Sequence, residues 1–168
     1  TTSYVFDDAQ EGEDLFALRK PGNIYTRITN PTVAVLEERI AALEGGVGAL
    51  ATASGMAAIT YAILGLAHAG DHVVAATTLY GGTFNLLKET LPRYGVTTTF
   101  VDVDNPEEIE AAIKDNTKLV LIESLGNPLI NIPDFEKIAE IAHSHKIPLV
   151  ADNTFGTPYL INVISQGV

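Results

Sequence analysis

Residues 118–128, KLVLIESLGNP, decide the fold class. Lys118 to Glu123 has the composition of a continuous apolar strand, and polar and turn-forming residues follow it at once. A strand that is apolar on both faces is typical of a parallel sheet that helices cover on both sides. The stretch therefore predicts a buried parallel strand with a polar loop at its carboxyl end.

The same alternation extends in both directions from this strand. Further strands are predicted at residues 73–76, 96–101 and 147–151. Amphipathic helices are predicted at 83–94, after Asn105-Pro106 and after Pro133-Asp134. Strands separated by helices form βαβ units, so we expect an α/β fold with a mostly parallel sheet and helices on both faces. A further helix at 56–67 is apolar all round and is expected to be buried on most sides and to end at Gly70.

The first part of the chain differs from the rest. Residues 1–31 are acidic and show no helical or strand period, which indicates an extended arm. The arm carries four aromatic residues, and these favour docking on a neighbouring subunit over free disorder: Tyr4, Phe6, Phe16 and Tyr25. Asn30-Pro31 then predicts the start of a helix, which Gly45-Gly46 would end. We therefore expect residues 1–31 as an arm and residues 32–168 as the main domain.

Composition excludes several classes of function. The chain has 168 residues, a net charge of −11 and 46% hydrophobic residues, which suits a packed domain and argues against nucleic-acid binding. It has no cysteine, which excludes disulfides and thiolate metal sites and is compatible with a cytoplasmic protein. No apolar run reaches membrane-spanning length, so no membrane partner is expected.

Candidate binding residues follow the predicted strands. Ligands of open α/β sheets bind outside the carboxyl ends of the strands, where this chain places Tyr80, Asn127, Asp152 and Thr154. Ser54, Gly55 and Met56 open the apolar helix, and a helix N-terminus is a ready anion site. Together these parts suit a flat, phosphorylated ring that contains nitrogen.

Each of these residues also has a purely structural reading. Ser54-Gly55 can be only a helix cap, Tyr80 a surface turn, and Asp152 a cap or turn residue. Glu123 can simply cap the next segment. The glycines at 45–48 follow a helix and lack the spacing of a dinucleotide fingerprint. The histidines at 68, 72, 143 and 145 do not have the spacing of metal ligands, so no metal site is expected.

Six segments, in order, resemble one known family. They are Tyr25-Thr26-Arg27 with Asn30-Pro31-Thr32, Glu44-Gly45-Gly46, Ser54-Gly55-Met56-Ala57-Ala58, Tyr80-Gly81-Gly82-Thr83, Glu123 to Pro128, and Ala151-Asp152-Asn153-Thr154-Phe155. The chain resembles the N-terminal portion of the Cys/Met-metabolism pyridoxal-phosphate (PLP) enzymes, which are transferases of fold type I, like aspartate aminotransferase. Its opening residues, with Gly22 to Arg27, are most similar to the O-acetylhomoserine sulfhydrylases.

The resemblance implies roles for single residues. The amides of Gly55 and Met56 would hold the phosphate of pyridoxal 5'-phosphate, beside Ser54. Tyr80 would stack on the ring and move protons, and Asp152 would pair with the ring nitrogen. In the same site, Asn127 would lie near the ring hydroxyl and Thr154 on the ring face, and Tyr25 and Arg27 would reach the phosphate of a neighbouring subunit. Glu123 would support these residues without contacting the cofactor itself.

The resemblance also implies an activity. The family binds its cofactor through a lysine Schiff base in a Ser-x-Thr-Lys motif beyond residue 168, so this chain alone is expected to be inactive. The expected reaction of the longer enzyme is γ-replacement on O-acetyl-L-homoserine by sulfide or a thiol, in methionine biosynthesis. Alternatives are γ-elimination by a lyase, cystathionine γ-synthesis, and a non-catalytic domain that binds a phosphorylated ligand. The expected assembly is a cytoplasmic homotetramer whose subunits share active sites in pairs, with a PLP-binding large domain that continues beyond Val168.

Overall fold

The computed structural model describes residues 1–168 and divides them into two compact units. The first unit holds Thr1–Ala42 and Gly46–Ala51, and the second holds Leu43–Gly45 and Thr52–Val168. No helix of the chain has the length and apolar character needed to cross a membrane.

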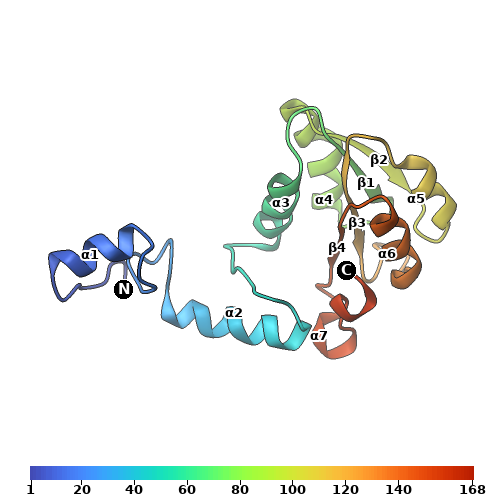
Figure 1. The fold of residues 1–168 in the computed structure, drawn as a ribbon. Coiled ribbons are helices and arrows are strands. Elements are labelled where there is room, and N and C mark those ends of the chain that lie inside the picture. Colours follow the sequence, from blue (N-terminus) through green and yellow to red (C-terminus); the bar gives the residue numbers. More distant parts are fainter. The chain divides into compact units, whose positions relative to one another are not determined.

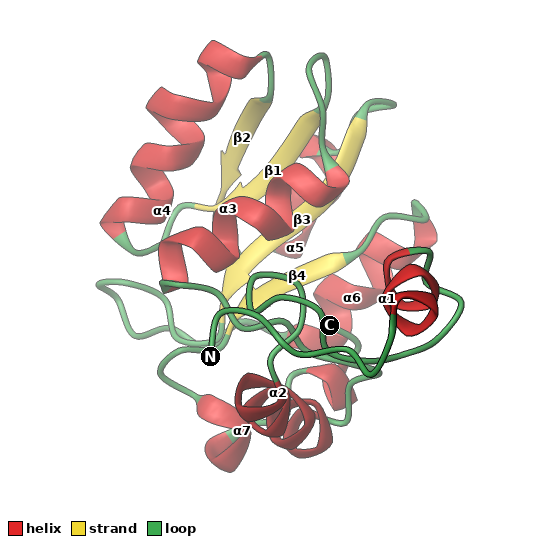
Figure 2. Cartoon of the chain, turned by 90° about the vertical axis from the view of Figure 1, so that its left-hand side faces the viewer, coloured by secondary structure: helices red, strands yellow, loops and turns green.

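The second unit is built on four parallel strands (Figure 2). They are β1 (His72–Ala76), β2 (Thr97–Val101), β3 (Thr117–Glu123) and β4 (Leu149–Asp152), in the order β2-β1-β3-β4. The chain passes from β1 to β2 on one side and then returns across β1 to β3. The direction of winding therefore reverses between β1 and β3, and the crevice at their carboxyl ends is where such sheets bind ligands.

The strands are buried as the sequence predicts. All five residues of β1 are buried, as are six of the seven in β3. The predicted fold class, a parallel sheet in an α/β domain, is confirmed.

Helices cover both faces of this sheet. Helix α3 (Gly55–Leu66) lies on one face with α4 (Gly81–Asn85), and α5 (Pro106–Ala112) and α6 (Phe135–Ser144) lie on the other (Figure 1). Asp134 begins α6 by accepting a hydrogen bond from the backbone N of Lys137 at 3.0 Å. Two short helices, α7 (Thr157–Leu160) and a 3₁₀ turn at Ile164–Gln166, follow β4.

The helix predicted at 83–94 is irregular. After α4 the chain makes a π-helical turn at Leu86–Thr90 and a 3₁₀ turn at Leu91–Tyr94. Pro92 has no N–H to continue an α-helical ladder, and Gly95 ends the segment with φ +81°.

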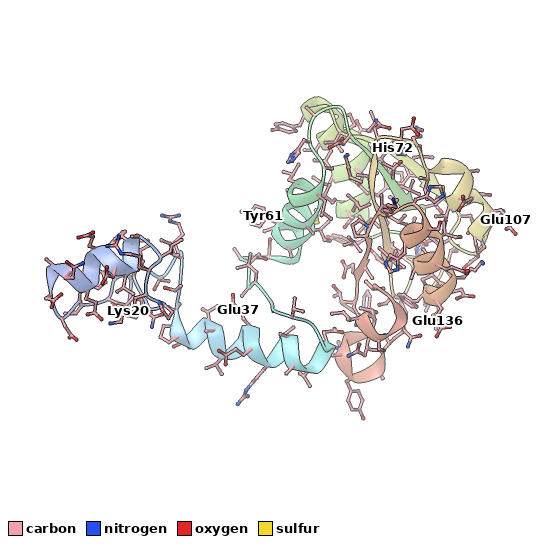
Figure 3. All side chains as sticks on the ribbon, in the orientation of Figure 1. Lys20, Glu37, Tyr61, His72, Glu107 and Glu136 are labelled. Atoms are coloured by element: carbon pink, nitrogen blue, oxygen red, sulfur yellow. The ribbon has the colours of Figure 1, made fainter.

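The expectation that the helix at 56–67 is buried on most sides is wrong for this chain. Only Ile63 within α3 is buried, whereas Tyr61 is 61% exposed on the side of α3 turned away from the strands (Figure 3). The helix also ends at Leu66, and Gly70, with φ +95°, turns the chain into β1. The sheet covers only the side of α3 that faces it. The apolar side chains on the opposite side of the helix therefore stay exposed.

The first unit is not wholly extended, which corrects the prediction of an arm without secondary structure. Residues Ala9–Phe16 form helix α1, and Asp8 accepts a hydrogen bond from the backbone N of Glu11 at 2.7 Å. Glu11 in turn accepts one from the backbone N of Asp7, also at 2.7 Å, so the two side chains satisfy two backbone donors at the start of the helix. The sequence carried this signal as Asp8 followed three residues later by Glu11.

Helix α2 (Pro31–Glu44) begins and ends as predicted. The Asn30 side chain accepts hydrogen bonds from the backbone N of Thr32 and Val33, at 2.9 and 3.2 Å. Gly45 ends the helix with φ +72°. The compact unit that holds residues 1–31 also takes in most of α2, so the division at residue 31 stays a prediction.

Candidate functional site

A cavity of about 490 Å³ lies at the carboxyl ends of β1, β3 and β4 in the second unit. The residues that line it are Ser54, Gly55, Met56, Ile59, Tyr80, Glu123, Ser124, Leu125, Asn127, Asp152, Thr154 and Phe155. All the site residues predicted within this unit are among them. The cavity is where the strand order predicts a binding crevice.

The floor of an anion site is present at the start of α3. The Ser54 hydroxyl accepts a hydrogen bond from the backbone N of Ala57 at 3.1 Å, and the Ser54 carbonyl accepts one from Ala58 at 3.0 Å. The amides of Gly55 and Met56 have no acceptor within the chain. A Cβ added at Gly55 would meet nothing within 4 Å, so there is open space beside this residue. Free amides at a helix N-terminus attract an anionic group.

The Tyr80 ring lies against the backbone of Gly82. A Cβ added at Gly82 would come within 2.6 Å of Cε1 of Tyr80 and 3.0 Å of Sδ of Met56. No side chain larger than hydrogen fits there without moving the ring. Tyr80 itself is 54% exposed, which leaves much of its ring open for contact with a ligand.

Two carboxylates face the cavity from neighbouring strands. Glu123 at the end of β3 pairs in register with Asp152 at the end of β4. Asp152 Oδ1 accepts hydrogen bonds from the backbone N of Thr154, at 3.0 Å, and from the Thr154 hydroxyl. Thr154 therefore fixes the orientation of the Asp152 carboxylate.

Glu123 is the more buried of the two carboxylates. Burial raises the pKa of its carboxyl group, the Tyr80 backbone N–H opposes this rise by donating to Glu123 Oε1, and repulsion from Asp152 adds to it.

The loop that carries Asn127 is fixed by one hydrogen bond within it and by bonds to Thr78 and Asp104 outside it. The backbone N of Asn127 donates to the Thr78 carbonyl at 3.2 Å, and that of Gly126 to the Asn131 carbonyl at 2.9 Å. The Asn131 side chain donates to both oxygens of Asp104 at 3.1 Å. Thr78, Asp104 and Asn131 were not predicted as part of the site, because each acts through a partner far away in the sequence.

Other cavity residues also went unrecognised in the sequence. Ile59 lies three residues after Met56 and therefore on the same face of α3, which the helical spacing alone predicts. Ser124 is 1% exposed and its hydroxyl has no hydrogen-bond partner in the chain. Nothing in the sequence distinguishes that serine from any other loop serine.

Tyr25 and Arg27 belong to the first unit. The Arg27 guanidinium lies 5.9 Å from the centre of the Tyr25 ring. Arg27 also lines a recess of about 350 Å³ in the first unit, together with Asn30 and Leu50. Their predicted place at a neighbouring subunit's phosphate remains a prediction.

The chain holds no group of three or more histidine, cysteine, aspartate or glutamate residues able to bind a metal ion. His145 instead pairs through Nε2 with Oε1 of Glu110 at 2.7 Å, and His72 lies buried in β1.

The fold and the cavity define a class of protein. Free amides at a helix N-terminus, an open aromatic ring and an oriented carboxylate fit the phosphate, the face and the nitrogen of a phosphorylated pyridine ring. The whole chain, residues 1–168, matches the family described as Cys/Met metabolism PLP-dependent enzyme. The chain belongs to this family, whose cofactor is pyridoxal 5'-phosphate.

Individual relatives agree with this assignment. Homocysteine synthase of Schizosaccharomyces pombe is 55% identical over 99% of this chain and 39% of its own length. O-acetyl-L-homoserine sulfhydrylase of Leptospira meyeri is 48% identical over 99% of this chain and 38% of its own length. The chain thus spans about two fifths of the curated relatives it matches.

A solved structure has the same fold. It is an O-acetylhomoserine (thiol)-lyase of Campylobacter jejuni, determined with N'-pyridoxyl-lysine-5'-monophosphate. It is 43% identical, with a TM-score of 0.96, over 100% of this chain and 41% of its own.

Proposed function

We propose that the protein to which this chain belongs replaces the acetate of O-acetyl-L-homoserine with sulfide or a thiol, which gives homocysteine or methionine. The observation that carries the proposal is the cavity of the second unit, where the free amides of Gly55 and Met56 and the oriented Asp152 carboxylate face one space. Relatives named homocysteine synthase, at 55% identity, and O-acetyl-L-homoserine sulfhydrylase, at 48%, support this substrate.

The anion site would bind the cofactor phosphate. The N–H groups of Gly55 and Met56 would donate to its oxygens, while Ser54 holds the first turn of α3 in place. Arg27 and Tyr25 of a neighbouring subunit would add a guanidinium and a hydroxyl to the same phosphate.

Asp152 would accept a hydrogen bond from the protonated ring nitrogen. Its Oδ1 is already fixed by Thr154, so the carboxylate needs little reordering when the ring binds. With its nitrogen protonated, the bound cofactor supplies an electron sink for the substrate carbanion.

Tyr80 and Asn127 would complete the ring site. The Tyr80 ring would stack on the cofactor, and its hydroxyl would move a proton as the substrate's leaving group departs. The Asn127 amide would donate to the ring hydroxyl from its braced loop.

No lysine lines the cavity of residues 1–168. We therefore expect these residues by themselves to turn over no O-acetyl-L-homoserine, since reaction needs an amine held beside the cofactor carbonyl. For the whole protein we propose a cytoplasmic homotetramer with active sites shared between subunits, an arm at residues 1–31 and a large PLP-binding domain from residue 32.

Product analysis of the whole protein tests the proposal. Incubated with O-acetyl-L-homoserine and sulfide, it should release homocysteine and acetate in equal amounts. Release of 2-oxobutanoate and ammonia at the same rate with and without sulfide would overturn γ-replacement in favour of γ-elimination. Formation of cystathionine from cysteine in preference to homocysteine from sulfide would assign a synthase, and no turnover would assign a binding protein.

A further inference from the structure

One contact at the cavity has no part in the roles above: it joins the side chain of Glu123 to the backbone of Tyr80. Glu123 Oε1 accepts a hydrogen bond from the Tyr80 backbone N–H at 2.5 Å. The two residues are 43 positions apart and stand at the carboxyl ends of different strands. The bond therefore ties the loop after β1 to the end of β3.

The loop before Tyr80 is held by the buried Leu79 and by the Thr78 carbonyl, which accepts from the Asn127 N–H, whereas Tyr80 itself has fewer contacts. Tyr80 begins α4 without a side-chain cap, and two glycines follow it. Its ring is half-exposed and rests on Gly82 and Met56. Tyr80 has glycines on its C-terminal side, so the hydrogen bond at its own amide is the side-chain contact that fixes the backbone from which the ring projects.

A glutamate at position 123 lowers the stability of the fold. It is 7% exposed, makes no ion pair, and has Asp152 as its register partner on β4. Burial and the neighbouring carboxylate both raise its pKa, and the Tyr80 N–H is the donor that opposes them. A buried carboxylate next to a second one destabilises a fold, so its presence points to a task in the site.

We propose that Glu123 is a positioning residue that holds the Tyr80 ring in place for the cofactor by anchoring the backbone N–H of residue 80. The inference rests on the proposed function in so far as Tyr80 is taken to contact the cofactor ring. Glu123 acts through Tyr80: what it supplies is an acceptor oxygen, and its negative charge is dispensable. The amide oxygen of a glutamine can accept the same bond.

Hydrogen exchange in the whole protein tests the anchor directly, without cofactor. Loss of a hydrogen bond to a carboxylate should speed exchange of the Tyr80 amide roughly 10- to 100-fold in Glu123→Ala. Glu123→Gln should exchange within about 3-fold of the unsubstituted protein, and Glu136→Gln, an exposed position on α6 (Figure 3), serves as the matched control. Unchanged exchange in Glu123→Ala would overturn the anchor.

A double-substitution cycle on pyridoxal phosphate affinity tests the path through Tyr80. Glu123→Ala should weaken binding roughly 10- to 100-fold alone, but less than about 3-fold when Tyr80→Ala is also present. Glu123→Gln should bind nearly as well as the unsubstituted protein. Equal losses in both Tyr80 backgrounds, or equal losses for glutamine and alanine, would overturn the proposal and assign Glu123 an electrostatic role.

These outcomes separate the two proposals. A cycle that fails while the protein still makes homocysteine from sulfide refutes only the role of Glu123. A cycle that succeeds in a protein that releases 2-oxobutanoate instead refutes only γ-replacement.

Discussion

Acid should destabilise this fold through one buried histidine, His72. The residue is 1% exposed and is the first residue of β1, so it lies at the amino ends of the strands, whereas the cavity lies at their carboxyl ends. Its Nδ1 lies 2.9 Å from the Thr117 hydroxyl and its Nε2 2.8 Å from the Thr99 hydroxyl, with the Lys114 ammonium 3.2 Å from Nε2. Since the ammonium can only donate, Nε2 accepts, and the neutral ring is the one that fits.

The sign of the effect follows from the pKa. Burial lowers the pKa of His72, and the Lys114 charge lowers it further. Between the ordinary value of about 6.5 and the lowered one, the unfolded chain binds a proton that the folded chain does not. The free energy of unfolding should therefore fall with acidity in that window, by up to about 1.4 kcal/mol per pH unit.

Urea unfolding of the whole protein at about pH 7.5 and about pH 5.5 measures this slope. His72→Gln should lose it, at a cost at neutral pH of about 1–3 kcal/mol for the two threonine hydrogen bonds. Lys114→Met should raise the folded pKa of His72 towards its ordinary value and so reduce the stability lost on acidification. Lys88→Met, which removes an ammonium that lies over the Phe84 ring, should leave that loss unchanged. Identical slopes for the unsubstituted protein and His72→Gln would refute the reasoning.

Four further changes test the site. Asp152→Asn in the whole protein should cut turnover by orders of magnitude with the fold intact, because an amide cannot keep the ring nitrogen protonated; near-normal kcat would remove Asp152 from the mechanism. Arg27→Ala should weaken cofactor affinity by at most about 3 kcal/mol, and oligomers mixed from Arg27→Ala and Asp152→Asn chains should recover activity if subunits share sites. Gly82→Ala should displace the Tyr80 ring and raise the cofactor Kd without speeding exchange of the Tyr80 amide; an unchanged Kd would contradict the ring contact seen at Gly82. Glu123→Gln should gain thermal stability over the unsubstituted protein as pH rises above about 4.5, because a raised folded pKa means that ionisation of Glu123 opposes folding; a constant difference in Tm would count against that.

The sequence predicted the strands well because their physical signal is local. A run such as 119–122 is apolar on both faces, and only burial between two helix layers accounts for that. Helix caps at Asn30 and Asp134 are equally local, since donor and acceptor are within three residues. The cap of α1 at Asp8 is local too, but the acidic composition of residues 1–31 favours an arm over a helix and hides this signal.

The site was predictable only in part. The edge rule for parallel sheets places Tyr80, Asn127 and Asp152 together, and the cavity does contain them. What it cannot reveal is the support behind them, such as the bond from Tyr80 to Glu123 across 43 positions. The sequence likewise places His72 only beside a glycine turn. Its hydrogen bonds to the hydroxyls of Thr99 and Thr117 join residues that are far apart in the chain, so the sequence does not predict them.

The strand order also determines when each strand can pair with its neighbours during synthesis on the ribosome. The central strand β1 is made before either neighbour, and its partner β3 lies 45 positions further along. At the usual rate of elongation those residues take roughly 2–9 s to add, and the backbone N–H and C=O groups on one edge of β1 stay unpaired throughout. Asp152, on β4, emerges later still. The nascent chain is therefore open to misassociation while the cofactor site still lacks Asp152. Cofactor supplied early meets only part of its site, whereas a chaperone that covers an unpaired strand edge protects the chain at this stage.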